Sequence, residues 1–200
     1  MKNQEQEGNL MSDQGQMQKI LIVVDMQNDF IDGSLGTREA AVAADRAAER
    51  IKKFNGSIIV TLDTHYQNYL HTAEGKKLPV EHCIYKTYGW RLHEKILNAL
   101  RGKVYKTVEK ETFGSPKLAD EIRKLAGSGN VELEMLGLCT DICVVSNALI
   151  LKAAFPEARL AVNASCCAGV TPQLHLAALQ VMSSCQIDII GEDGNEEAKG

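Results

Sequence analysis

A cysteine at position 143 follows an apolar run and a tight turn, in the stretch MLGLCTDICVVSN at residues 135–147. The pattern places Cys143 in the first turn of a helix. Backbone N–H groups at a helix start lack partners and carry partial positive charge. They favour the thiolate and lower the pKa of a cysteine below its free value of about 8.5. We therefore predict that Cys143 is a nucleophile.

Three charged residues follow other apolar runs in the same way. Asp25 ends the run 19–25, Asp63 ends the run 57–63, and Lys110 lies just past a third run. In an open parallel sheet, sites form at the carboxyl ends of the strands. We therefore expect these side chains to meet Cys143 at one edge of a sheet. Lys106 is a rival to Lys110, but it lies inside the strand pattern.

These groups together are suited to acyl transfer. Asp25 can act as a general base for the thiol proton, and Lys110 can hold the carboxylate and the thiolate in their charged forms. Such neighbours shift a pKa by about 1–3 units, which lowers both values here. The backbone N–H groups of Cys143 and of Cys139 in the turn are candidates for an oxyanion hole. The predicted chemistry passes through a thioester.

A second set of polar residues is typical of a divalent metal site. Asp63 and His65 lie on the same side of a strand end, and Glu74 and His82 follow in the segment 64–86. Imidazole and carboxylate ligands suit zinc, iron or manganese. The alternative is that the histidines are hydrogen-bonded pocket residues. The segment has no clean period, and long loops in compact domains are usually functional.

Three aromatic residues are candidates for an apolar pocket that binds a flat ring, and each is equally compatible with ordinary core packing. They are Phe30, Trp90 and Phe113.

Apolar runs and helical patterns alternate along the chain, which favours a parallel sheet with helices on both faces. The strands are expected at 19–25, 57–63, 103–108, 131–138, 159–164 and 185–190, and the helices at 40–54, 90–100, 116–126, 141–154 and 172–184. We predict one three-layer α/β/α domain over 19–190 with a six-stranded, mainly parallel sheet. A flexible tail at 1–18 and a polar tail at 191–200 flank it.

Composition argues against several classes of partner. The net charge of −4 leaves no basic surplus to hold a phosphate backbone, so nucleic acid is not expected. No run of eighteen apolar residues exists, so we expect no membrane span. Residues 1–18 lack the pattern of a signal peptide. We therefore expect a cytoplasmic protein whose six cysteines are reduced.

Five motifs resemble those of the isochorismatase-like cysteine hydrolases, and most closely the branch of nicotinamidases and related amidases. They are VDMQNDF at 24–30, LDTH at 62–65, LPVEHC at 78–83, EKETFGS at 109–115 and GLCTDICV at 137–144. The resemblance implies a catalytic triad of Asp25, Lys110 and Cys143. It implies a metal bound by Asp63, His65 and His82, with Glu74 as a fourth ligand. It also implies a cis peptide at Leu138–Cys139.

The resemblance also implies an activity. The leading reaction is hydrolysis of nicotinamide to nicotinate and ammonia, with the metal binding the pyridine nitrogen, in a homo-oligomer. An N-carbamoyl or ureido substrate is the alternative within the same scaffold, and a non-catalytic binding protein is a third possibility. The true isochorismatases lack the nucleophilic cysteine, so Cys143 argues against vinyl-ether hydrolysis.

Overall fold

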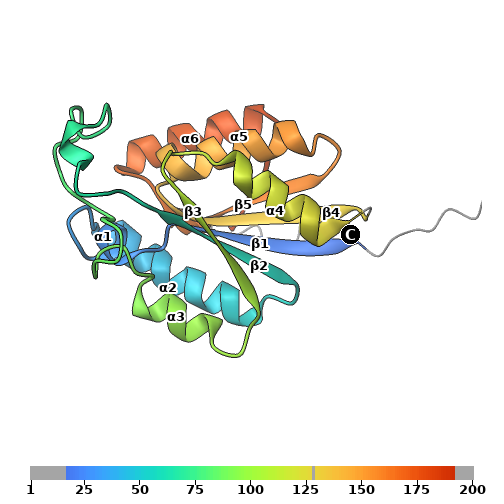
Figure 1. The fold of residues 1–200 in the computed structure, drawn as a ribbon. Helices are drawn as coiled ribbons and strands as arrows, with labels where there is room; N and C mark the ends of the chain where they lie inside the picture. Colours follow the sequence, from blue (N-terminus) through green and yellow to red (C-terminus); the bar gives the residue numbers. More distant parts are fainter. Residues whose placement is uncertain (1–16, 128, 192–200) are drawn as a thin grey trace, which may run out of the picture.

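The computed structural model describes residues 17–127 and 129–191, in which a six-stranded parallel sheet lies between two layers of helices (Figure 1). The strand order is β3-β2-β1-β4-β5-β6, and every neighbouring pair is parallel. The strands are β1 Gln18–Val24, β2 Ser57–Asp63, β3 Tyr105–Lys110, β4 Val131–Leu138, β5 Arg159–Ala168 and β6 Asp188–Ile190. This confirms the predicted fold class.

The helices divide between the two faces of the sheet. Figure 1 shows α2 and α3 below the sheet and α4, α5 and α6 above it. The helices are α1 Asn28–Ile31, α2 Arg38–Lys53, α3 Glu94–Leu100, α4 Pro116–Ala126, α5 Val145–Ala154 and α6 Pro172–Ser184, with short turns η1 Tyr69–His71 and η2 Thr140–Val144. None of the helices in the described ranges is long and apolar enough to cross a membrane.

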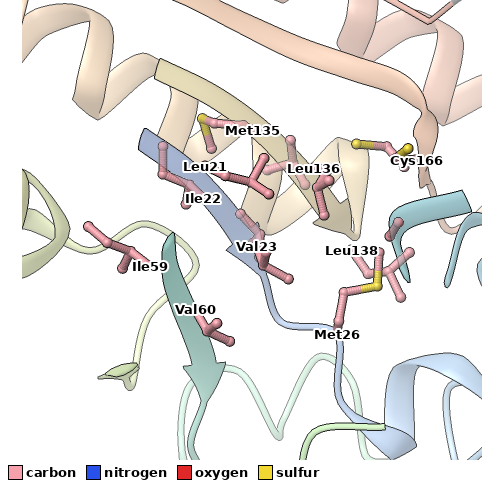
Figure 2. Packing of buried hydrophobic residues seen from close by; sticks show 14 of the residues in the cluster. Leu21, Ile22, Val23, Met26, Ile59, Val60, Met135, Leu136, Leu138 and Cys166 are labelled. Carbon is pink, nitrogen blue, oxygen red and sulfur yellow. The ribbon is translucent and has the colours of Figure 1, made fainter. Parts of the chain in front are cut away.

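The core is densest around the central strands β1 and β4. Residues 20–24 of β1 are completely buried, as a strand covered on both faces must be. Figure 2 shows Leu21, Ile22 and Val23 of β1 packed among side chains of β2 and β4. The burial of these strands explains why the sequence shows continuous apolar runs there. It also fixes the places where the strands end, and those ends carry the polar residues.

Several predicted boundaries shift. The helix expected from Trp90 begins only at Glu94, because residues before it pair with another extended segment. Gln27 bridges Leu92 in antiparallel fashion, and the N–H of Asn28 donates to the carbonyl of Arg91. The third strand reaches Lys110 instead of ending at Val108, and the fifth continues to Ala168.

The strand order reverses between β1 and β4, and such a switch point opens a crevice at the carboxyl ends of the strands. Asp25 follows β1 at this point, and Cys143 follows β4. Asp63 and Lys110 are register partners at the ends of β2 and β3. The sheet therefore delivers all four groups to one edge.

Of the predicted tails, residues 1–16 and 192–200 lie outside the described residues, and Gln18 belongs to β1.

Candidate active site

A buried ammonium group stands at the centre of the site. Lys110 Nζ lies 2.7 Å from Asp25 Oδ2, 2.9 Å from Asp63 Oδ1 and 3.3 Å from Cys143 Sγ. The side chain of Lys110 is inaccessible to solvent. The structure therefore brings together the three residues proposed from the sequence as a triad, and it adds Asp63 to them.

The backbone at Asp25 adopts a left-handed conformation, with φ of 48°, which non-glycine residues seldom populate. The hydroxyl of Thr61 on β2 contacts this residue twice. It donates to Asp25 Oδ1 at 2.6 Å and accepts the N–H of Asp25 at 3.2 Å. One carboxylate oxygen is thus held by Thr61, while the other faces Lys110.

The turn before Cys143 has an unusual backbone. The Leu138–Cys139 peptide is cis, as the resemblance implied. A π-helical turn, η2, then precedes α5, so Cys143 does not lie in the first turn of a regular α-helix. Asn147 secures this turn, since its Nδ2 donates to the carbonyl of Cys143 at 2.8 Å and its Oδ1 accepts the N–H of Ser115 at 2.9 Å.

The electrostatics of the thiol differ from the prediction. Complete burial raises the pKa of Cys143 well above its usual value, and the charge of Asp25 adds to this effect more than Lys110 opposes it. The predicted lowering of the thiol pKa is therefore wrong, because the sequence pattern showed the helix start but not the burial. Burial also raises the pKa of Asp25, against the effect of Lys110. The site thus holds a neutral thiol beside a carboxylate with increased proton affinity.

The pKa of Lys110 shifts the other way. Burial alone would lower it, but the charges of Asp25 and Asp63 outweigh burial and raise the pKa above the usual lysine value. The ammonium group therefore keeps its proton throughout the neutral pH range. It is a fixed positive charge and not a proton donor.

Asp63, His65 and His82 form a buried group whose ligand atoms all lie within 4.8 Å of one another. His65 Nε2 lies 3.0 Å from Asp63 Oδ2, yet it is buried without a well-directed hydrogen bond. His82 Nδ1 donates to the carbonyl of Val80 at 2.8 Å, and its Nε2 lies 3.7 Å from Asp63 Oδ2. A backbone partner on the second ring nitrogen is typical of metal-bound histidines. These donors fit a divalent ion.

Glu74 lies at the margin of this group. Its Oε1 is 3.6 Å from His65 Nε2 and 3.8 Å from His82 Nε2, and its side chain is partly exposed. Glu74 is thus in reach of the histidines as an additional oxygen donor.

A cavity of about 560 Å³ opens over Cys143 and the side chains of Asp63, Glu74 and His82. Its walls are mainly apolar and include Phe30, Leu78, Phe113, Leu138 and Ile142. Phe30 is buried, while Phe113 is half-exposed. Trp90 does not line this cavity, which corrects the expectation for that residue. Its indole Nε1 instead donates to Thr64 Oγ1 at 2.9 Å, and its ring packs on Tyr85.

Sequence reasoning missed two residues that hold the site together. Gln27 is fully buried and accepts the N–H of Asp63 at 2.8 Å while donating to its carbonyl at 2.9 Å. Thr61 was also missed. A third support is His175 of α6, which the sequence indicates as a structural residue and which lies 2.8 Å from Thr140 Oγ1 in the turn that carries Cys143. For Gln27 and Thr61 a signal existed, since each is a polar residue within or beside an apolar strand.

The fold and the site define a three-layer α/β protein in which a thiol, an ammonium group and two carboxylates gather at the switch point of a parallel sheet. Residues 19–193 match the family model described as the isochorismatase domain, and the chain belongs to this family. Several of the proteins that it resembles are named as nicotinamidases or amidases.

Similarity to individual proteins is distant but spans most of the chain. The nicotinamidase/pyrazinamidase of Mycobacterium tuberculosis is 25% identical over 186 residues, which cover 86% of this chain and 98% of that protein. The structure of nicotinamidase/pyrazinamidase PncA from Bacillus subtilis matches with a TM-score of 0.75 and 22% identity, covering 86% of this chain and 99% of that one.

Two further solved structures have the same fold. The pyrazinamidase of Pyrococcus horikoshii in complex with zinc matches with a TM-score of 0.71 and 26% identity, covering 86% of this chain and 98% of that one. The N-carbamoylsarcosine amidase of Thermoplasma acidophilum matches with a TM-score of 0.70 and 24% identity, covering 90% and 100%.

Proposed function

We propose that this protein hydrolyses nicotinamide to nicotinate and ammonia through a thioester on Cys143. The observation that carries the proposal is the contact of one buried ammonium group with the thiol and with the carboxylate of Asp25. Cys143 lines an apolar cavity of a size that admits a small aromatic amide.

The order of steps follows from the charges. As Sγ of Cys143 attacks the amide carbon, Asp25 accepts the thiol proton, which its raised pKa favours. The backbone N–H groups of Cys139 and Cys143 stabilise the oxyanion. Asp25 then returns the proton to the leaving nitrogen, the C–N bond breaks, and ammonia departs. Finally Asp25 takes a proton from water as the water oxygen attacks the thioester carbon. The C–S bond then breaks, Asp25 passes the proton to Sγ of Cys143, and the acid leaves and ionises to nicotinate.

Lys110 stabilises this sequence without transferring a proton. While Asp25 carries the thiol proton, the developing negative charge lies on sulfur, 3.3 Å from Nζ. Once the proton returns, the charge of Asp25 is again balanced by Nζ at 2.7 Å. The ammonium group is thus preorganised for both charge distributions.

Asp63, His65 and His82 would hold a divalent ion, with Glu74 as a further donor. Zinc, iron and manganese suit this donor set, and the Pyrococcus horikoshii relative was crystallised with zinc. When bound, the ion supplies a Lewis acid able to hold a heteroaromatic ring nitrogen. Phe30, which lies against His82, supplies an apolar surface for the ring.

Replacing the nucleophile tests the proposal. Cys143→Ala should lower the rate of ammonia release from nicotinamide by at least about 1000-fold, because no other group can form the acyl intermediate. Cys185→Ala is the matched control, since Cys185 is exposed and should leave the rate unchanged. The circular dichroism spectra of both variants should match the parent protein. Undiminished ammonia release by Cys143→Ala would refute the mechanism.

An N-carbamoyl substrate is the second candidate, because the same fold occurs in the N-carbamoylsarcosine amidase of Thermoplasma acidophilum. A panel of nicotinamide, pyrazinamide and N-carbamoyl amino acids, compared by kcat/KM, separates the two. The predominantly apolar wall of the cavity favours the aromatic amides.

A further inference from the structure

We infer that Thr61 is a positioning residue for Asp25, and that its hydroxyl group sets the orientation in which this carboxylate accepts the thiol proton. The inference rests on the base role proposed for Asp25. Nothing in the family match or in the predicted triad assigns a role to this threonine.

The hydroxyl of Thr61 makes two contacts with the same residue. It donates to Asp25 Oδ1 at 2.6 Å and accepts the backbone N–H of Asp25 at 3.2 Å. Both residues are completely buried, so water cannot replace either contact. The two hydrogen bonds therefore link the position of the Asp25 backbone to the rotation of its carboxylate.

Asp25 needs this restraint more than an ordinary aspartate would. Its φ of 48° is unfavourable for a side chain with a Cβ atom, and such conformations persist only where the surroundings enforce them. The N–H held by Thr61 belongs to this strained residue. With Oδ1 occupied by the hydroxyl, Oδ2 is the oxygen that faces Lys110. The threonine thus selects which oxygen is directed toward the reacting groups.

Packing alone does not require a hydroxyl at this position. The neighbours of Thr61 along β2 are Val60 and Leu62, and Thr61 is the one polar residue between Ile58 and Leu62. Valine has nearly the same shape and the same preference for a strand. A threonine here therefore points to the hydrogen bonds.

Thr61→Val removes the hydroxyl and keeps the shape. Losing a buried hydrogen bond to a charged group should reduce kcat for nicotinamide by about 10- to 100-fold. KM and bound metal should stay within about twofold, because the cavity lining and the metal-binding side chains are untouched. Thr61→Ser retains the hydroxyl and should restore kcat to within about fivefold of the parent enzyme.

Thr107→Val is the matched control, since it makes the same chemical change at an exposed position of the neighbouring strand β3. Its kcat should equal that of the parent. A Thr61→Val enzyme with parental kcat, or a Thr61→Ser enzyme as impaired as Thr61→Val, would overturn the inference. If either of these outcomes is found while Cys143→Ala is inactive in the same assay, only the role of Thr61 is refuted and the proposed function stands. If Cys143→Ala is active, the proposed function and the role of Thr61 both fail.

Discussion

At the scale of residues, the site contains two carboxylates, one ammonium group and one thiol. Asp25 and Asp63 share Lys110, so one positive charge faces two negative charges in a buried space. Burial disfavours a thiolate at Cys143, and a thiolate would also add a third negative charge beside Asp25, so the pKa of Cys143 is raised and not lowered. The resting site therefore favours a neutral thiol, and the proton must move during the attack.

Asp63 also belongs to the group of candidate metal ligands, since its second oxygen faces His65 and His82. Removing one imidazole from this group should weaken zinc binding by at least about 100-fold, because three buried donors become two. We predict this loss for His82→Ala, measured by competition with a chromophoric chelator. His71→Ala should bind zinc like the parent, since His71 is exposed and outside the group. Unchanged zinc affinity in His82→Ala would contradict the assignment.

The sequence predicted the reactive residues better than the residues that hold them in place through hydrogen bonds. Asp25, Lys110 and Cys143 could be placed because each follows or ends a recognisable strand, and strand ends meet at one edge. Thr61 and Gln27 could not be assigned, because their contacts depend on the register and twist of β1 against β2. The sign of the thiol pKa shift depended on complete burial, which no local pattern reports.

At the scale of elements, the backbones of β1 and β4 approach each other closely at Gly137. Gly137 has φ of 133°, and a Cβ atom on it would lie 2.1 Å from the carbonyl oxygen of Val24. The register between β4 and β5 also shifts between Met135 and Gly137. This irregularity directs the chain into the turn that carries Cys143. The sequence predicted β4 and the following helix, but not the π-helical turn between them.

Gly137→Ala should therefore lower the free energy of unfolding by more than about 3 kcal/mol, since backbone strain and a clash with backbone act together. Gly127→Ala is the matched control, because Gly127 has φ of 57° but open space around it. It should cost less, about 1–3 kcal/mol, the range for a residue held in a sparsely populated backbone conformation. Urea denaturation measures both values. Equal losses of unfolding free energy in the two variants would show that the close contact of residue 137 with Val24 adds nothing to the cost.

At the scale of the whole molecule, the sheet order explains why residues far apart in sequence meet. Asp25 and Cys143 follow adjacent central strands, while Asp63 and Lys110 end the next two strands on one side. Alternating apolar runs and helical patterns were sufficient to predict this architecture. The cavity walls were harder to predict, because they come from connecting segments. Trp90 was misplaced for that reason, since the segment before α3 pairs with residues 27–28 in extended form.

The central claim is that the substrate's acyl group passes through Cys143. The most direct measurement is mass spectrometry of peptides from enzyme quenched with acid during turnover of nicotinamide. We predict a nicotinoyl group on the peptide that contains Cys143, and none on the peptide that contains the exposed Cys185. An acyl group on another residue, or turnover in which the Cys143 peptide never carries the adduct, would contradict the account.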